Sequence, residues 1–593
     1  MNTSFLLQKA VFSNKNTKAL ECLYFRNEKG IFDTSFNRLK LIESDKYPLK
    51  LSLDTFFGAF PMETWYKNAN IKNVILNIKA KGKFILNLII TNGYEHPQKI
   101  ESMFVDVENF ENLSIEINIE DLPFIKGILY PEFIILNKNF EIEYIKYKTK
   151  QKPLKDVKLA IIMPTYKREK YVKNNLSILE NELFSDKNYN VDIFVIDNGQ
   201  TLDIQDTKNI KIIKSPNYGG AGGFTRGIIE VLDKDYSHVL LSDDDTLYEV
   251  ESIKRLINFF KYTKENVVVG GGMFNFGNKN ILNEQGAFYI YMRWKLLKHN
   301  LNMCLAKNVI KFTIEENTNY FGWWFFACNK NLFNKFGLPL PIFFRGDDQE
   351  FGIRIKNKVN FVSLLGVAIW HKEFYKKDMP LVDYYIIRNC LILSILHEKK
   401  SFVLIKNLLE TLYKSLLTYR YERAKFIIKG IEDFLKGPEF LIDTKPDKYY
   451  QYLQKEQKKK LVDVSSEFVE YKFNLPIKIK RFATAVTFNG HLLPYIFIKK
   501  GENSHQDGYI IERLQTNRRS AIFRKETVLY YEPTSGYGIK YKINKKKFFF
   551  LLFKGLYQIT KLFFNYEKLQ KRYKKEFKYL TSLEFWKKYL NEK

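Results

Sequence analysis

The sequence predicts an α/β protein whose central domain has a mostly parallel sheet, preceded by an antiparallel β-domain and followed by a mainly helical domain. Three observations lead to this prediction. Alternating apolar runs fill residues 1–150, apolar strands and helical segments alternate over 155–395, and basic, aromatic, mainly helical sequence fills 396–593. A chain of 593 residues is long enough for several domains of ordinary size.

The first 150 residues consist of short strands and turns. Apolar and polar residues alternate in runs such as 74–78 and 84–90, and Asn92-Gly93 and Pro123 supply turn signals. This pattern is typical of an antiparallel sandwich or barrel. We find no catalytic constellation there and interpret this domain as a scaffold or accessory module.

Continuous apolar runs mark the strands of the central domain. Four of them end at polar or turn-forming residues: 159–163, 191–196, 210–213 and 238–241. Helical segments are predicted over about 169–184 and from near Gly223. The repetition of strand and helix predicts a mostly parallel sheet with covering helices. Chemistry gathers at the carboxyl ends of the strands in such sheets, and the polar motifs below follow strands.

Three adjacent carboxylates, at 243–245, follow the last of these strands. Side chains alternate along an extended segment, so Asp243 and Asp245 point the same way. Neighbouring carboxylates repel one another unless a cation offsets their charge. Mg²⁺ and Mn²⁺ prefer such oxygens together with phosphate oxygens of a substrate. We therefore predict a metal site, against the alternative of a solvated acidic loop.

A second acidic cluster, at 345–350, opens a predicted helix. A carboxylate there can serve as the general base that takes a proton from an incoming hydroxyl. The alternative is that these acids only stabilise the helix dipole. His371 follows the strand-like run 361–369. A histidine at a strand end can supply a nitrogen to the same metal, although a lone histidine is more often structural.

The segment 217–227 is rich in glycine and enters a helix. Small residues let a ligand approach the backbone, and a helix N-terminus favours phosphate. The segment matches neither the P-loop nor the dinucleotide-binding pattern, and a tight strand-to-helix turn explains it equally well. Trp323 and Trp324 lie between the two acidic clusters. Adjacent indoles can form a platform for sugar C–H faces or can fill the core.

The net charge of +29 favours an anionic partner, such as nucleic acid, acidic lipid or a phosphorylated substrate. In the segment 545–564, Lys554 and Lys561 interrupt clusters of Phe and Leu. We expect this segment to lie on an anionic membrane surface; the alternative is a core helix with a basic face. A strand-like patch is expected at about 482–497.

We find no signal peptide and no uncharged run of the ~18 apolar residues that a spanning helix needs. Four cysteines occur, and they match no zinc spacing: Cys22, Cys304, Cys328 and Cys390. Four thiols do not make a disulfide framework in so long a chain, which fits a reducing cytoplasm. We therefore expect a cytoplasmic protein, held peripherally at the inner face of the membrane.

Taken together, the motifs resemble those of family 2 glycosyltransferases of the GT-A fold, and among these the mycobacterial-type polymerising galactofuranosyltransferases. The matching pieces run in order within about residues 155–395: 164–168, 197–199, 217–224, 243–245, 322–324, 339–341, 347–348, 370–371 and 388–389. The resemblance also implies an N-terminal β-domain and a helical C-terminal region, which the patterns above predict independently.

The resemblance implies a role for each motif residue. Asp243, Asp245 and His371 would hold Mn²⁺ or Mg²⁺, and Asp348 would be the base of an inverting transfer. The residues expected to contact a UDP-sugar donor are Arg168, Asp197, Asn217, Gly219, Gly220 and Asp244. The residues expected to contact the acceptor are Trp323, Trp324 and Asp347.

The resemblance makes UDP-galactofuranose the expected donor and a lipid-linked or cell-surface glycan the expected acceptor. Arg345 and Gly346 stand where the family has Trp before the Asp-Asp pair, and Glu350 replaces a shorter acid, so a rhamnosyl or other hexosyl transferase is the alternative. A two-metal nuclease or polymerase would also use clustered aspartates. The ordered motifs argue against it, and we expect no nucleic-acid partner. Assembly into a homo-oligomer stays open.

Overall fold

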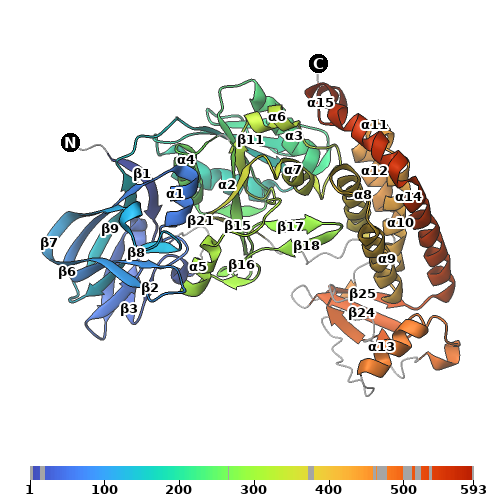
Figure 1. Cartoon of the computed structure of the whole chain (residues 1–593), viewed down its shortest axis with the longest axis horizontal. Coiled ribbons are helices and arrows are strands. Elements are labelled where there is room, and N and C mark those ends of the chain that lie inside the picture. The colour runs from blue at the N-terminus through green and yellow to red at the C-terminus, as the bar shows by residue number, and fades with distance from the viewer. Residues whose placement is uncertain are drawn as a thin grey trace.

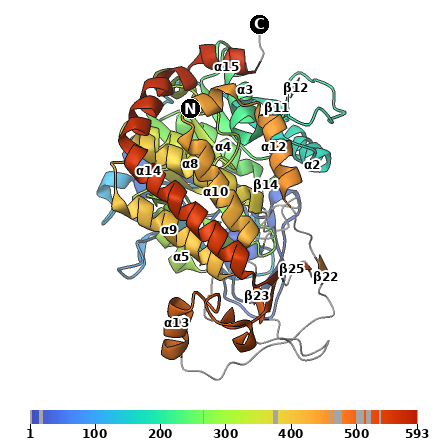
Figure 2. The same ribbon diagram turned by 90° about the vertical axis from the view of Figure 1, so that its right-hand side faces the viewer.

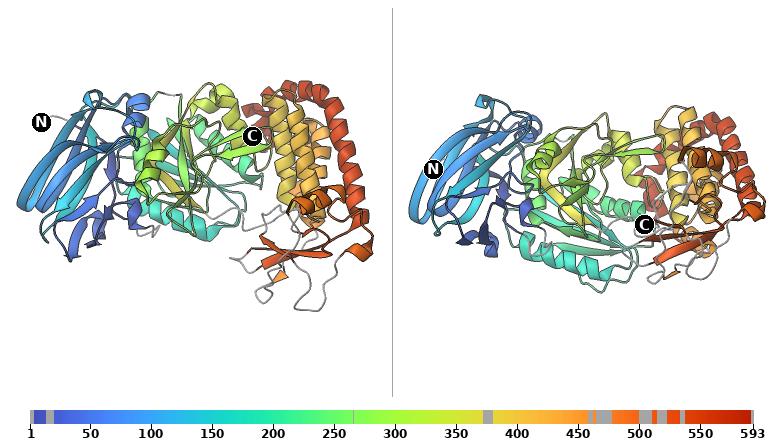
Figure 3. Two further views of the ribbon diagram at one scale, coloured as in Figure 1. Left: turned by 60° about the horizontal axis from the view of Figure 1, so that its bottom comes forward. Right: turned by 90° about the horizontal axis from the view of Figure 1, so that it is seen from below.

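We analysed a computed structural model of the chain. It describes residues 4–13, 20–264, 266–371, 380–457, 462–463, 477–498, 510–513, 522–532 and 537–590. An N-terminal sheet, a central α/β region and a C-terminal set of helices follow one another along the long axis (Figures 1 and 3). The predicted α/β class, with an antiparallel sheet before it and helices after it, is confirmed. The domain boundaries near residues 150 and 395 stay predictions.

Nine antiparallel strands form the N-terminal sheet, in the order β2-β5-β8-β6-β9-β4-β3, with β1 beside β9 and β7 beside β6. Their bounds are β1 Phe5–Ala10, β2 Arg26–Asn27, β3 Gly30–Asp33, β4 Leu39–Ser44, β5 Leu49–Ser52, β6 Asn73–Thr91, β7 Gln98–Asn118, β8 Ile128–Ile135 and β9 Glu141–Thr149. The long strand β6 pairs with β7 along one edge and with β8 and β9 along the other. Its side chains alternate between buried and half-buried, so one face covers the core.

The N-terminal sheet and the central region share a hydrophobic core. Arg255 is fully buried at this junction. Its guanidinium donates to the carbonyls of Lys9 (2.8 Å) and Phe57 (3.1 Å) on the N-terminal side and to that of Leu365 (2.7 Å) on the other. One buried charge therefore satisfies backbone groups of both parts of the molecule.

Cys22 and Cys304 form a disulfide between the N-terminal part and the central region, across 282 residues of sequence. The sequence analysis expected no disulfide framework and did not predict this bond. Cysteine spacing along the chain carries no information about a pair that only tertiary folding brings together. Cys328 and Cys390 are free and buried.

The central sheet has ten strands in the order β12-β11-β10-β13-β20-β15-β16-β19, with β21 beside β15 and β14 beside β21. Strands β10 to β13 pair in parallel, as do β15 and β21, whereas β20 runs antiparallel to both of its neighbours. The strands are β10 Lys158–Thr165, β11 Asn190–Asp197, β12 Ile210–Lys214, β13 His238–Leu241, β14 Thr246–Tyr248, β15 Val267–Asn275, β16 Ile281–Glu284, β19 Leu301–Asn302, β20 Phe326–Asn329 and β21 Asn360–His371. A separate hairpin pairs β17 Ala287–Ile290 with β18 Arg293–Leu296.

Helices cover this sheet and complete the N-terminal part. Their bounds are α1 Met62–Ala69, α2 Glu169–Leu179, α3 Gly219–Leu232, α4 Val250–Phe260, α5 Ala306–Thr313, α6 Asn331–Phe336 and α7 Asp347–Ile355. The predicted helix over 169–184 is present as α2 followed by a π-helical turn. The helix predicted from near Gly223 begins one turn earlier, at Gly219.

The C-terminal region consists mainly of helices. They are α8 Pro380–His397, α9 Phe402–Leu417, α10 Tyr421–Leu435, α11 Glu439–Asp443, α12 Pro446–Glu456, α13 Ile477–Val486, α14 Lys545–Leu580 and α15 Leu583–Tyr589. The long helix α14 lies across α8, α9 and α10 (Figure 2). Among the described residues, no helix is long and apolar enough to cross a membrane.

A small sheet joins β22 Val462–Asp463, β23 Ile510–Arg513, β24 Thr527–Glu532 and β25 Tyr537–Lys542. The strand-like patch predicted at 482–497 is wrong, because α13 occupies its first part and a 3-10 turn follows at Tyr495–Phe497. Beyond α14 the chain returns to the central region. There the Leu338 amide donates to the Thr581 carbonyl (2.8 Å) and the Trp586 indole donates to the Pro339 carbonyl (2.8 Å).

Candidate active site

The acidic triplet follows β13 directly, as the sequence predicts. The Ser242 hydroxyl fixes its start, sharing a hydrogen bond of 2.6 Å with the Tyr248 hydroxyl and donating to the Trp324 carbonyl (3.0 Å). The next strand, β14, pairs antiparallel with the end of β21, so that Thr246 lies opposite His371. This strand pair brings the histidine to the triplet from a distant part of the sequence.

Asp243, Asp245 and His371 form one cluster. The His371 Nε2 atom lies 3.1 Å from an Asp245 oxygen and 3.8 Å from an Asp243 oxygen. One ligand atom from each residue can be chosen so that all three lie within 4.8 Å of one another. Two carboxylates and one imidazole are a donor set suited to Mn²⁺ or Mg²⁺. The structure thus brings the three predicted ligands together.

The charges of this cluster also fit a cation. Desolvation, with the neighbouring charges of Asp245 and Asp244, raises the pKa of Asp243 to about 7, although His371 opposes the rise. Desolvation acts in the same direction on Asp245, but its hydrogen bond with His371 and the positive charges nearby outweigh it and lower the pKa. Excess negative charge is therefore unfavourable here, and a divalent cation would relieve it.

Asp244, the middle acid, has partners other than His371. It is almost fully buried, and it accepts hydrogen bonds from the Thr165 hydroxyl (2.6 Å) and from Arg168 (2.8 Å). The same Arg168 guanidinium lies 2.7 Å from an Asp245 oxygen. Arg168 thus places a fixed positive charge beside the metal cluster. Donor contacts by Arg168 and Asp244 stay predictions.

Asp197 and Asn217 lie where two further strands end, and both support their own loops. The two Asp197 oxygens accept from the backbone amides of Gly199 (3.0 Å) and Leu202 (2.8 Å). The Asn217 side-chain oxygen accepts from the Gly219 amide (3.1 Å). In this structure the two residues shape the edge at which the donor is expected, and direct contact with the donor stays a prediction.

The glycine-rich segment makes a tight strand-to-helix turn, and contact of Gly219 and Gly220 with the donor stays a prediction. Gly223 and Gly227 let α3 pack tightly on β10, because a Cβ atom would lie 2.7 Å from Pro164 and 2.3 Å from Ile162, respectively. Gly219 has a φ of 72°, and a Cβ there would lie 2.2 Å from the Phe343 carbonyl oxygen. At Gly220 a Cβ would lie 3.6 Å from an Asp347 oxygen. The first turn of α3 therefore adjoins the second acidic cluster.

Asp347 and Asp348 form the first turn of α7. Burial raises the pKa of Asp347 to about 6. Burial also raises the pKa of Asp348 well above its usual value, and the charges of Asp347 and Asp243 raise it further. Direct contact of Asp348 with the acceptor hydroxyl stays a prediction. A carboxylate with a raised pKa is a stronger base, as proton abstraction from a hydroxyl requires.

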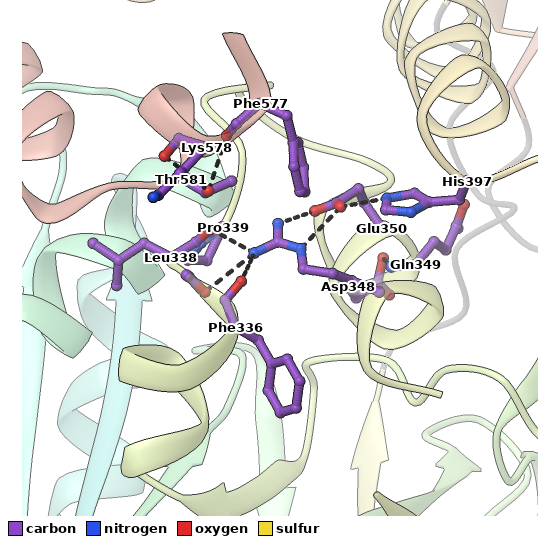
Figure 4. A network of polar contacts seen from close by, with 12 residues as sticks. Phe336, Leu338, Pro339, Asp348, Gln349, Glu350, His397, Phe577, Lys578 and Thr581 are labelled. Atoms are coloured by element: carbon purple, nitrogen blue, oxygen red, sulfur yellow. Dashed lines mark hydrogen bonds and ion pairs between the residues drawn. The ribbon is translucent and has the colours of Figure 1, made fainter. Parts of the chain in front are cut away.

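Glu350, two residues later on α7, belongs to a different network (Figure 4). It is fully buried and forms a bidentate pair with Arg354, and His397 Nε2 lies 2.7 Å from one of its oxygens. Burial alone would raise the pKa of Glu350, but Arg354 and His397 outweigh it and lower the pKa to about 2. Arg354 in turn donates to the carbonyls of Phe336, Gly337 and Leu338.

Trp323 and Trp324 precede β20, and both indoles are buried. The Trp323 ring packs edge-on against Phe224 at 5.2 Å and against Phe351 at 6.1 Å. The Trp324 indole donates to the Gly271 carbonyl (3.2 Å). Both rings thus take part in core packing beside the acidic triplet, and their contact with the acceptor stays a prediction.

One further carboxyl near the site was missed by the sequence analysis. Glu284 ends β16 and is almost fully buried, and its burial raises its pKa to about 7. Burial also raises the pKa of Tyr320, and the charges of Asp348 and Glu284 raise it further. A single acid at the end of a short strand gives no recognisable signal in a sequence.

Residues 160–322 match the model of Glycosyl transferase family 2. This match shows a family 2 glycosyltransferase domain within the chain, and the acidic triplet lies inside the matched residues. The match confirms the resemblance inferred from the motifs. Asp348 and His371 lie beyond the matched residues, and the pairing of β14 with β21 brings His371 to the domain's acidic triplet.

Among known proteins, the chain is similar to galactofuranosyltransferase GlfT2 of Mycolicibacterium smegmatis, with 26% identity over 421 residues. That match covers 66% of this chain and 65% of the relative. The GlfT2 of Mycobacterium tuberculosis is 25% identical over 433 residues, which is 66% of each chain. The match thus spans just under two-thirds of each relative. The solved structure of Staphylococcus aureus TarS 1–349 has 17% sequence identity and a TM-score of 0.31, covering 54% of this chain and 97% of that one.

Proposed function

We propose that this protein is an inverting, metal-dependent glycosyltransferase that transfers galactofuranose from UDP-galactofuranose to a hydroxyl group of a glycan. The observation that carries the proposal is the cluster of Asp243, Asp245 and His371, whose ligand atoms lie within 4.8 Å of one another, in a chain with a family 2 domain. The names of the relatives support galactofuranose over rhamnose or another hexose.

Mn²⁺ or Mg²⁺ held by Asp243, Asp245 and His371 would supply positive charge that stabilises the departing diphosphate. Asp348 accepts the proton of the acceptor hydroxyl as that oxygen attacks the anomeric carbon. The bond to the diphosphate breaks in the same step, so the configuration at that carbon inverts. Arg168 adds a second positive charge on the donor side, where it is already paired with Asp244 and Asp245.

We further propose that the acceptor is a lipid-linked or cell-surface glycan and that the protein lies on the anionic inner face of the membrane. Support comes from α14, whose outward side alternates lysines with exposed aromatic rings. Phe550 is 66% exposed and Phe564 is 77% exposed. The members of this stripe are Lys546, Phe550, Phe553, Lys554, Tyr557, Lys561 and Phe564. Such a surface suits the interface of an anionic bilayer.

The first experiment measures release of the nucleotide from a panel of donors by the purified protein, with Mn²⁺ or Mg²⁺. The panel contains UDP-galactofuranose, UDP-galactopyranose, UDP-glucose and dTDP-rhamnose. Metal-dependent release from UDP-galactofuranose alone supports the proposed donor. Preference for another donor overturns the sugar but keeps the mechanism, whereas metal-independent release contradicts the role of the cluster.

A further inference from the structure

The segment 342–346 leads directly into the two acids of α7, and its backbone is unusual. Phe343 has a φ of 75° and Arg345 a φ of 68°, and Gly346 follows with a φ of 95°. Left-handed conformations are unfavourable for residues with a Cβ atom, and they persist only where the surroundings hold them. We call residues 342–346 the acid-bearing loop, because the chain passes from them directly into Asp347 and Asp348.

Asn389 on α8 holds this loop. Its side chain is 1% exposed, and its amide nitrogen donates to the carbonyls of Phe344 (3.0 Å) and Arg345 (2.6 Å) and lies 3.2 Å from that of Ile342. Its oxygen accepts from Arg388 Nε (2.9 Å), and Arg388 also donates to the Ile342 carbonyl (2.7 Å). Side chains of α8 therefore bind three of the five carbonyls of the loop.

Of the two remaining carbonyls of the loop, that of Gly346 accepts from the Glu350 amide (2.8 Å) within α7, and that of Phe343 faces the glycine-rich segment. It accepts from the Ala221 amide (2.9 Å), and it lies so close to Gly219 that a Cβ there would be 2.2 Å away. The acid-bearing loop therefore joins the first turn of α3, on the expected donor side, to Asp348. None of these contacts involves Asp243, Asp245 or His371.

We propose that Asn389 is a positioning residue for the transfer reaction. Its amide fixes the acid-bearing loop and thereby sets the distance between Asp348 and the donor bound beside α3. This inference rests on the proposed role of Asp348 as the base. A misplacement of about 1 Å in such a group lowers turnover by about 10²-fold without weakening binding at the metal cluster.

The chain provides a matched control. Asn407 on α9 is also buried, and it uses the same chemistry: its amide donates to the Tyr291 carbonyl (2.6 Å) and its oxygen accepts from Arg293 Nε (3.0 Å). It has no contact with the acid-bearing loop among the interactions described. Asn389→Ala and Asn407→Ala therefore remove the same groups, and only the first touches the loop.

The experiment compares the full-length wild type with N389A, N389D and N407A, using UDP-galactofuranose as donor. We expect N389A to lower kcat by about 10²-fold while the donor KM changes by less than about 3-fold, and N407A to leave both near the wild type. N389D has almost the shape of asparagine but turns a carboxylate toward three carbonyls, so we expect it to be at least as impaired as N389A. If Asn389 only filled space, N389D would stay active, because Asp and Asn have almost the same shape. An unchanged kcat in N389A overturns the proposal.

Amide hydrogen exchange provides a measurement that needs no activity. We expect peptides covering 342–348 and 218–222 to exchange faster in N389A, and to keep the wild-type rate in N407A. If the wild type shows no transfer, the proposed function fails, and the exchange data still decide whether Asn389 holds the loop. Unaltered exchange in N389A overturns the proposal in either case.

Discussion

Asp348 and Glu350 belong to the same helical turn, but their side chains have different surroundings. Residues two apart on a helix project about 200° from each other, so both cannot face the same site. The charges of Asp347 and Asp243 raise the pKa of Asp348, whereas Glu350 binds Arg354 and His397. The sequence analysis treated 345–350 as one cluster. The predicted helix over these residues already implied that positions 348 and 350 lie on different faces. The partners of Glu350 come from other turns and helices, which the local sequence does not identify.

Replacing Asp348 by Asn removes the proposed base and keeps the shape of the side chain. We expect kcat to fall by about 10²–10⁴-fold, the usual contribution of a general base. Metal-dependent UDP binding, measured by calorimetry, should stay near the wild type because Asp348 is not among the three ligands. Full activity in this variant would contradict the assignment of the base.

Replacing His371 by Ala removes one of three proposed metal ligands. Loss of outer partners of a metal site alone costs about 10–100-fold in affinity, so we expect the half-saturating Mn²⁺ concentration to rise at least about 10-fold. The measurement is a Mn²⁺ titration of UDP binding. His299→Ala serves as the control, because His299 is exposed and outside the cluster. Equal Mn²⁺ titrations in the two variants would rule out a ligand role for His371.

Replacing Glu350 by Gln leaves the Arg354 charge without its partner. Breaking a buried pair in this way costs about 3–5 kcal/mol of unfolding free energy. The lowered pKa of Glu350 implies that its contribution is present in full above pH 4.5, and is lost as the pH falls through about 2. Denaturant unfolding at pH 7 measures the difference, and a loss below about 1 kcal/mol would argue against a stabilising role.

At the scale of elements, the strands of the central sheet were predictable because a buried parallel strand is a continuous apolar run. The start of α3 was predicted one turn late. Glycine disfavours helices in general, but here tight packing of Gly223 on Pro164 and of Gly227 on Ile162 favours the helix. The patch at 482–497 was predicted as strand, yet Phe482 and Val486 are four residues apart, the spacing of one helix face.

The exposed stripe of α14 allows a test of membrane binding. We expect the triple substitution of Phe550, Phe553 and Phe564 by Ser to weaken binding to vesicles containing anionic lipid by at least about 10-fold, since each buried Phe contributes about 1.5–3 kcal/mol. The fold should be unaffected because these rings are exposed. Co-sedimentation with vesicles measures the binding.

The matched control for this test replaces Tyr94 and Phe104, which are 83% and 61% exposed on the N-terminal part. Their loss should leave vesicle binding unchanged. Equal weakening by both sets of substitutions would show that α14 is not the membrane-binding surface. If vesicle binding does not weaken as the salt concentration rises, the lysines of α14 do not contribute to it.

At the scale of the whole molecule, the three parts and their order were predictable from composition and pattern. Their attachments were not. The Cys22–Cys304 disulfide and the hydrogen bonds of Arg255 join segments that are far apart in the sequence, and no local pattern encodes such pairs. For the same reason, only the family resemblance linked His371 to the metal cluster at the level of sequence. In the structure, the pairing of β14 with β21 explains why His371 lies beside the acidic triplet.

Replacing Arg255 by Met leaves the carbonyls of Lys9, Phe57 and Leu365 without a donor. Each unsatisfied buried group costs about 1–3 kcal/mol, so we expect a loss of at least about 3 kcal/mol of unfolding free energy. Lys72→Met is the control, because both partners of the Lys72–Glu120 pair are exposed and such pairs contribute little to stability. Denaturant unfolding compares the two variants, and equal losses would contradict a special role for Arg255.

The return of the chain to the central region has a consequence for its synthesis. The segment before the acid-bearing loop is closed by Thr581 and Trp586, and Trp586 is 247 residues beyond its partner Pro339. At a translation rate of about 5–20 residues per second, roughly 10–50 s pass between the synthesis of Pro339 and that of Trp586. During that interval the N-terminal and central sheets of the nascent protein can fold, but the segment leading to Asp347 and Asp348 lacks its contacts with α15, which the ribosome has not yet made.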